Sequence, residues 1–142
     1  MITQKSVKVK SMARPIQFNR PLALKQSMYL FWENGYTNTS LQQLGERMDM
    51  RPGSLYAVFK NKRQLFFETL ELYFERSSNL LKDRLQSGNT AMQSIHIFFE
   101  SLIDDLVDEK TMKGCLMINT ATELADQDDE IKHKLDIMFK SH

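Results

Sequence analysis

The segment from Thr39 to Lys62 constrains the fold more than any other part of this 142-residue chain. It reads TSLQQLGERMDMRPGSLYAVFKNK, with a tight turn between two short apolar patterns. The apolar residues of each pattern are spaced to share one helix face: first Leu41, Leu44 and Met48, then Leu55, Val58 and Phe59. Helices this short must bury their apolar faces against a third helix. The segment therefore predicts a helix-turn-helix.

The rest of the composition predicts an all-α fold. The chain has three prolines and five glycines but no run of alternating β-branched residues. We expect a mobile basic arm over residues 1–19, a homeodomain-like three-helix domain over residues 20–63, and a second helical domain over residues 64–142.

Capping residues and apolar periodicity predict where each helix begins or ends. Ser40 and Gln43 have the spacing of a capping box, and Asn61 precedes Gln64 by the same interval. Helices are expected over residues 21–34, from Ser40, over 52–59, from Asn61 to near Gly88, from Thr90, over 114–125, and from near Asp128.

Charge is unevenly distributed along the chain. Residues 1–63 contain eleven Lys and Arg and three acidic residues, a net charge of +8, whereas residues 64–142 carry −7. A basic first half suits contact with a polyanion, from which the acidic second half would be repelled. The alternative is that both charge blocks are only solvated surface.

Several functional classes lack support in the sequence. The only cysteine, Cys115, cannot form an internal disulfide and suits a reducing cytosol. No signal peptide or apolar run of ~18 residues is present, so we expect a cytoplasmic protein without a membrane partner. No catalytic constellation or metal-ligand cluster is recognisable, and we expect no enzymatic activity, cofactor or metal.

The second helix of the motif has the residues of a DNA recognition helix. Its basic, small-residue surface would allow close approach to base edges in the major groove; these base or groove candidates are Arg51, Gly53, Ser54 and Ala57. Hydroxyl and ammonium groups around it could contact phosphates; these candidates are Thr39, Tyr56, Lys60 and Lys62. The N–H groups at the start of the next helix would add an anion site beside Lys62.

The joint spacing of these residues resembles the TetR/AcrR family of bacterial transcriptional regulators. The resemblance covers about residues 14–75 and rests on Gly35-Tyr36, Thr39-Ser40-Leu41, Gly53-Ser54-Leu55-Tyr56, Phe59, Lys62 and Leu65. It implies phosphate contacts from Thr39, Tyr56 and Lys62, and base contacts from the exposed face of the recognition helix. Arg14-Pro15 resembles the arm of a subgroup in which an arginine enters the minor groove.

Three residues depart from the family pattern. Asp49 occupies the turn position that usually holds glycine, although Asp tolerates a left-handed conformation better than most residues. Arg51 stands where many members have a Ser or Asn cap, and Pro52 replaces a frequent basic residue. These changes leave the predicted fold intact and the operator sequence undefined.

The resemblance also implies roles for the second helical domain. In this family the C-terminal helices bind a small ligand and pair two subunits, which places two recognition helices on successive half-sites. Members usually have two further long helices, so we expect an incomplete dimerisation surface here. Leu135, Met138 and Phe139 would then be left with uncovered apolar surface.

Cys115 is a candidate sensor. The segment 113–120 resembles one in which some members carry a cysteine that responds to electrophiles or oxidants. A thiol at a helix N-terminus beside Lys110 or Lys113 should have a lowered pKa. The alternative is a small, inert packing residue.

The sequence thus favours a sequence-specific regulator, a repressor released by a small molecule or an electrophile. Its expected partners are a double-stranded DNA operator, an inducer and, if the C-terminal helices are supplied, a second copy of the chain. Two alternatives stay open: a truncated helical interaction protein without productive operator binding, and a DNA-binding module without ligand response.

Overall fold

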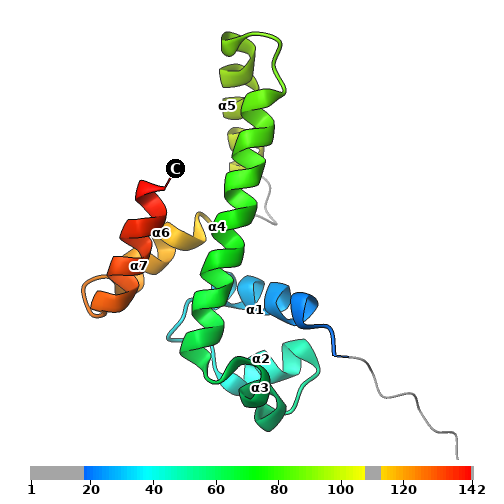
Figure 1. Ribbon diagram of the computed structural model, residues 1–142, viewed down its shortest axis with the longest axis vertical. Coiled ribbons are helices and arrows are strands. Elements are labelled where there is room, and N and C mark those ends of the chain that lie inside the picture. Colours follow the sequence, from blue (N-terminus) through cyan, green and yellow to red (C-terminus); the bar gives the residue numbers. More distant parts are fainter. Residues whose placement is uncertain (1–17, 108–112, 142) are drawn as a thin grey trace, which may run out of the picture.

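A 25-residue helix, α4 (Lys62–Gln86), forms the long axis of the molecule (Figure 1). The structure is a computed structural model that describes residues 18–107 and 113–141. Within these residues every regular element is helical, which confirms the predicted all-α fold. The other helices are α1 (Arg20–Asn34), α2 (Leu41–Met48), α3 (Pro52–Phe59), α5 (Ala91–Val107), α6 (Leu116–Leu124) and α7 (Asp129–Lys140).

Helices α1, α2 and α3 gather around the first turns of α4, at the lower end of the molecule in Figure 1. Their apolar faces meet in one core, where Leu44, Leu55 and Leu65 are completely buried. The rings of Phe31 and Phe66 pack edge to face with centroids 4.9 Å apart. The short helices α2 and α3 are thus held by a common core, as their apolar spacing predicts.

The predicted helix caps at Ser40 and Asn61 are confirmed. The Ser40 hydroxyl accepts a hydrogen bond from Gln43 N at 3.1 Å, and Gln43 Oε1 accepts one from Ser40 N at 2.7 Å. Asn61 Oδ1 accepts a hydrogen bond from Gln64 N at 2.8 Å. Asp49 adopts the left-handed conformation, with φ 53° and ψ 44°, and ends α2 in place of the usual glycine.

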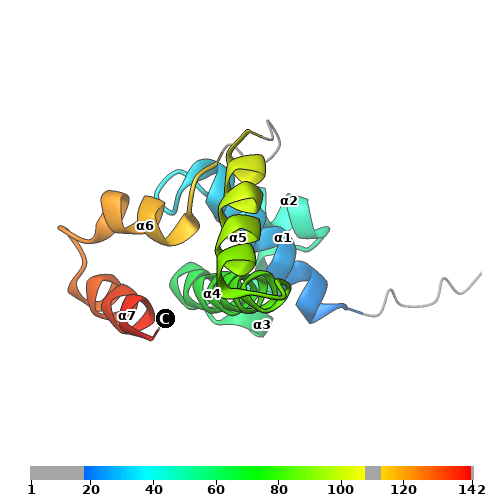
Figure 2. The ribbon, with the colours of Figure 1, turned by 90° about the horizontal axis from the view of Figure 1, so that it is seen from above.

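Helices α6 and α7 pack as a pair beside α4 (Figure 2). Ile131, Leu135 and Met138 form the buried face of α7. The prediction that Leu135 and Met138 would be uncovered is therefore wrong, because α7 folds back along α6 and fills this position. Only Phe139, 46% exposed, fits that expectation.

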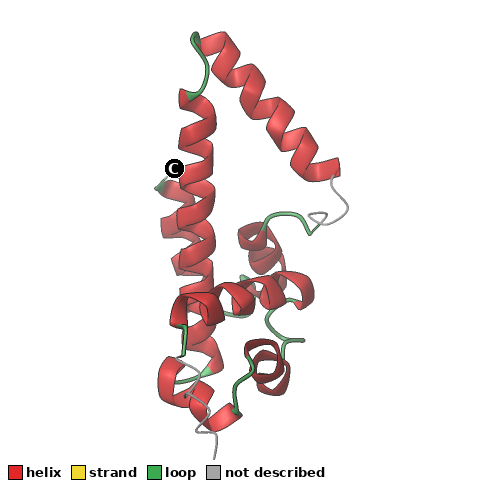
Figure 3. Cartoon of the chain, turned by 90° about the vertical axis from the view of Figure 1, so that its right-hand side faces the viewer, coloured by secondary structure: helices red, strands yellow, loops and turns green. Residues whose placement is uncertain are grey.

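Helix α5 runs back along α4 from the far end and diverges from it (Figure 3). Several of its large apolar side chains are exposed within the described part of the chain; these are Met92, Ile95, Phe99, Leu102, Ile103 and Val107. Uncovered apolar surface is thus concentrated on α5, instead of on the α7 residues that the sequence suggested.

Neither a membrane span nor a metal cluster occurs in the residues that the structure describes. No helix within residues 18–107 and 113–141 is both long enough and apolar enough to cross a bilayer. The same residues contain no group of three or more His, Cys, Asp or Glu side chains placed to hold a metal ion.

Candidate nucleic-acid interface

Helix α3 is anchored on one face and exposed on the other. Leu55 and Phe59 are buried in the core and fix the helix on α1, α2 and α4. The opposite face is open to solvent and carries Arg51, Gly53, Ser54, Tyr56 and Ala57. A Cβ added at Gly53 would meet no atom of the chain within 4 Å. Packing inside the chain therefore does not require glycine at position 53, and its small size leaves this surface open to an external partner.

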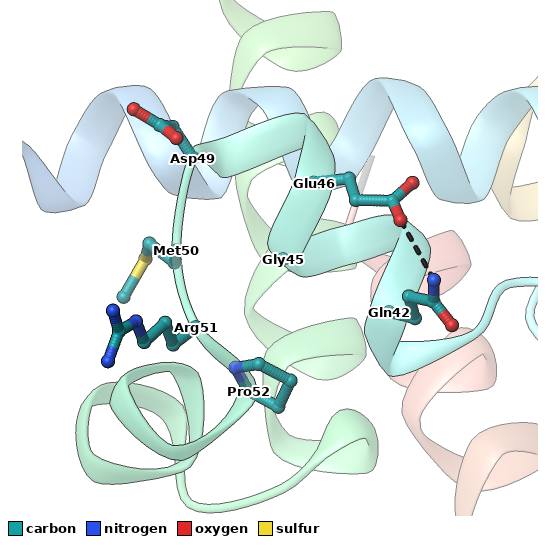
Figure 4. A pocket seen from close by; sticks show the side chains of 7 residues that line it. All are labelled: Gln42, Gly45, Glu46, Asp49, Met50, Arg51 and Pro52. Atoms are coloured by element: carbon teal, nitrogen blue, oxygen red, sulfur yellow. Dashed lines mark hydrogen bonds between the residues drawn. The ribbon is translucent and has the colours of Figure 1, made fainter.

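A shallow cleft of about 370 Å³ lies between α2 and α3, at the turn of the helix-turn-helix (Figure 4). On its α2 side, Gln42 Nε2 donates a hydrogen bond to Glu46 Oε1 at 2.9 Å. Arg51 extends away from this pair, toward Met50 (Figure 4). No acidic side chain among the described residues lies within ion-pair distance of Arg51. Its guanidinium is thus available for a ligand beside the start of α3.

The far end of α3 presents a second exposed cation and a hydroxyl. Lys60 ends the helix with φ 64°, and its backbone N–H donates to Tyr56 O at 2.9 Å. The Lys60 side chain is exposed, and Tyr56 is 43% exposed. Both predicted phosphate-contacting residues are therefore accessible. Sequence reasoning missed the positive φ of Lys60, because lysine carries no signal for a left-handed conformation.

Thr39 is placed differently from the prediction. Its side chain is completely buried, and its hydroxyl donates a hydrogen bond to Gly35 O at 2.6 Å. The predicted phosphate contact from the Thr39 hydroxyl would require this bond inside the loop that precedes α2 to break first. The neighbouring Ser40 is exposed and caps α2.

Lys62 is half-buried and turns toward the interior of the chain. Its Nζ lies 4.3 Å from the centroid of the Tyr36 ring, a cation–π contact. Burial lowers the pKa of Lys62, and the charge of Glu123 acts in the opposite direction. Lys62 does lie at the start of α4, as predicted, but its ammonium points to the loop between α1 and α2.

Three other basic residues of the first half form ion pairs within the described part of the chain. Arg20 pairs with Glu68 at 2.6 Å, and Arg47 pairs with Glu33 at 2.8 Å. Arg63 pairs with both Asp128 and Glu130 of the second half. The acidic second half is thus partly a partner of the basic first half. Within residues 18–107 and 113–141, Arg51 and Lys60 form no ion pair and lie exposed at the two ends of α3.

Cys115 lies at the N-terminus of α6 and is half-buried. Its thiol is beside the Tyr73 hydroxyl; burial, followed by the hydrogen bond with Cys115, raises the pKa of Tyr73 to about 12. Lys113 was predicted to lie beside the Cys115 thiol. Its Nζ instead bonds Glu33 Oε1 at 2.7 Å and lowers the pKa of Glu33. Lys110 lies outside the described residues, and so does Arg14 with the rest of residues 1–17.

Glu123 is a residue that sequence reasoning missed. Its carboxylate, at the end of α6, accepts hydrogen bonds from the backbone N–H groups of Tyr36 and Thr37. Periodicity within α6 contains no signal for a contact with a loop 86 residues away.

An anchored helix with an exposed face, preceded by a capped helix and a tight turn, defines a helix-turn-helix DNA-binding domain. Residues 23–69 match the family model of bacterial regulatory proteins of the tetR family. The helix-turn-helix part of the chain is therefore similar to this tetR family.

Individual relatives agree with this similarity. The chain is 34% identical over 127 residues to the HTH-type transcriptional repressor ComR of Escherichia coli (strain K12), covering 89% of this chain and 60% of ComR. It is 31% identical over 120 residues to the HTH-type transcriptional regulator YezE of Bacillus subtilis (strain 168), covering 84% of this chain and 62% of YezE. The chain thus spans about three fifths of the length of these relatives.

A solved structure extends the similarity to three dimensions. A cysteine mutant of the TetR family transcriptional regulator CifR, complexed with 26-bp operator DNA, matches with a TM-score of 0.73 and 30% identity. The match covers 87% of this chain and 65% of the CifR chain.

Proposed function

We propose that the chain binds double-stranded operator DNA and regulates transcription as a repressor. The observation that carries this proposal is the exposed face of α3, where Arg51 extends outward while Leu55 and Phe59 hold the helix in the core. The repressor ComR and the operator-bound CifR, which resemble this chain in sequence and fold, support the same function.

Most of the proposed DNA contacts come from exposed side chains on α3 and at its ends. Arg51, Gly53, Ser54 and Ala57 would meet base edges or the groove, because they lie on the exposed side of α3. Tyr56 and Lys60 would contact phosphates on the flanks. Lys62 would contact a phosphate from its place beside the Tyr36 ring, and Arg14 would enter the minor groove. Thr39 is not among the proposed contacts.

We infer that a small molecule releases the protein from DNA and that the regulator works as a homodimer. Two recognition helices must reach half-sites about one helical turn, roughly 34 Å, apart, which requires a second copy. Release follows when a ligand favours a spacing of the two recognition helices that no longer fits the operator. Cys115 is the proposed sensor residue for an electrophile or oxidant, since its thiol lies at the N-terminus of α6.

The proposal is tested by titrating the protein against the DNA upstream of its own gene, over a range of salt concentrations. We expect a shifted complex with this fragment at protein concentrations that do not shift an unrelated duplex. The logarithm of the binding constant should fall linearly with the logarithm of salt concentration. Absence of binding to both duplexes at low salt would contradict the proposal.

A second candidate function is a helical interaction protein without operator binding. It is favoured by the exposed apolar side chains of α5, which include Phe99 at 55% and Ile103 at 57% exposure. Failure of DNA binding together with monomeric sedimentation would support this function in place of the first.

A further inference from the structure

Glu123 joins the end of α6 to the loop between α1 and α2. Its Oε2 accepts a hydrogen bond from Tyr36 N at 3.0 Å, and its Oε1 accepts one from Thr37 N at 2.7 Å. One carboxylate therefore binds two consecutive backbone N–H groups, each with its own oxygen. This is a strong arrangement, because a charged acceptor makes shorter and stronger hydrogen bonds than a neutral one.

The loop is shaped to receive this carboxylate. Gly35 has φ +78°, and a Cβ added there would lie only 2.7 Å from Glu123 Oε2. Any other residue at position 35 would both strain the backbone and push the carboxylate away. The glycine that ends α1 thus also makes room for a residue 88 positions later in the chain.

The same loop leads directly into the surface proposed to meet DNA. Thr39 at its end is bonded back to Gly35 O, and the next residue, Ser40, caps α2. At the start of the loop, the Tyr36 ring makes a cation–π contact with the Lys62 ammonium. The charge of Glu123 also acts on this ammonium. Movement of the Glu123 carboxylate would therefore move both the start of α2 and the Lys62 side chain.

We propose that Glu123 is a positioning residue for DNA binding: from α6 it sets the loop before α2 and the place of the Lys62 ammonium. This inference rests on the proposed function, because it assumes that these elements meet DNA. It assigns a specific contact through which a displacement of α6 reaches the DNA-binding surface.

Glu123 can be changed without separating α6 and α7 from helices α1 and α4. Other contacts hold them together, among them the ion pairs Lys113–Glu33 and Arg63–Asp128 and the hydrogen bond from Trp32 Nε1 to Gly114 O at 3.0 Å. Glu123→Ala should therefore fold with the same helix content as the wild-type chain. Asp126→Ala is the matched control, since Asp126 is an exposed acid just beyond the same end of α6.

The structural half of the proposal is tested by hydrogen exchange on the full chain without DNA. In Glu123→Ala, exchange of the Tyr36 and Thr37 amides should accelerate about tenfold or more, as expected when a hydrogen bond to a charged group is lost. Asp126→Ala should leave both rates unchanged. Unchanged exchange in Glu123→Ala would overturn the proposal, whether or not the chain binds DNA.

The functional half is tested by anisotropy titration of a labelled mixed-sequence duplex of about 30 base pairs at low salt. We expect Glu123→Ala to weaken binding by about tenfold, a common magnitude for coupled sites, and Asp126→Ala to have no effect. An affinity equal to that of Asp126→Ala would overturn the proposed link to DNA. Absence of binding by the wild-type chain would instead contradict the proposed function, while the exchange result would still stand.

Combining variants separates positioning of Lys62 from a general effect on the fold. If Glu123 places the Lys62 ammonium, Lys62→Ala should weaken binding less in the Glu123→Ala background than in the wild-type background. Equal losses in both backgrounds would overturn the part of the proposal that concerns Lys62.

Discussion

Arg63, at the start of α4, and Asp128, the residue that caps α7, form a two-point ion pair. Arg63 Nη1 lies 2.6 Å from Asp128 Oδ2, and Nη2 lies 2.7 Å from Oδ1. The same carboxylate accepts a hydrogen bond from Ile131 N at 3.1 Å. A single acidic side chain therefore both caps α7 and joins it to α4, the helix that follows the helix-turn-helix.

We expect stability to fall at low pH because of this pair. The hydrogen bond from Arg63 lowers the pKa of Asp128 to about 2, whereas an unfolded chain has a value of about 3.9. A group with a lower pKa in the folded state stabilises it fully above the unfolded pKa. The contribution of Asp128 should thus be complete above pH ~4 and be lost as the pH falls toward ~2.

Asp128→Ala isolates this contribution. Loss of the cap and of a partly exposed ion pair should lower the free energy of unfolding by about 1–2 kcal/mol at neutral pH. Urea titrations at neutral and acidic pH should show a smaller pH dependence in the variant than in the wild type. The exposed neighbour Asp129 gives the control, and an equal loss in Asp129→Ala would contradict the assigned role.

The local elements of the fold could be predicted because their signals are local. Ser40 and Asn61 cap their helices through residues three positions away, and Pro52 begins α3. Their partners are specified within a single turn of chain. The spacing that placed Leu55 and Phe59 on one face likewise determines which face of α3 is exposed.

The contacts that sequence patterns did not predict lie in loops or join distant segments. Thr39 was predicted to contact phosphate, whereas in the structure its hydroxyl donates a hydrogen bond to Gly35 O. Lys113 was predicted to lie beside the cysteine thiol, whereas its Nζ bonds Glu33 Oε1 at 2.7 Å. Charge counting separated the two halves of the chain, whereas Arg63 and Asp128 pair across them. Sequence periodicity contains no information on these partners.

Thr39→Val should act on folding instead of on a DNA contact. The change leaves Gly35 O, in a partly buried place, without its hydroxyl donor, which should cost about 1 kcal/mol of unfolding free energy. The exposed Thr37 offers a control in the same loop, and Thr37→Val should be nearly neutral. Equal stability of Thr39→Val and wild type in urea, with weaker DNA binding, would restore the phosphate contact.

Asp49→Gly should stabilise the turn between α2 and α3. Asp49 has φ 53°, a conformation that strains an L-residue by roughly 1–2 kcal/mol, and glycine adopts it without strain. Because glycine also loses more chain entropy on folding, the net gain should be about 0.5–1 kcal/mol. Thermal unfolding measures it, and a lower midpoint in the variant would show that the Asp49 side chain stabilises the turn.

Arg51 and Lys60 should affect DNA binding in different ways. Arg51→Ala should change which sequences are preferred, because Arg51 is proposed to meet base edges. Lys60→Ala should weaken binding to all sequences alike and reduce the salt slope by about one. Lys25→Ala is the control, because it removes the same charge from an exposed lysine on α1. Selection from a random duplex pool distinguishes the two, and a uniform loss in Arg51→Ala would refute its assignment to bases.

Cys115→Ser should abolish release from DNA by a thiol-directed electrophile such as a maleimide. The thiol is half-buried beside Tyr73, whose ring lies 5.1 Å from that of Trp32. A group added to the sulfur must therefore displace Tyr73 or the start of α6. Since Trp32 is the only tryptophan and donates to Gly114 O, its fluorescence should change with the same concentration dependence as release. If the electrophile releases wild type and Cys115→Ser equally well, Cys115 is an inert packing residue.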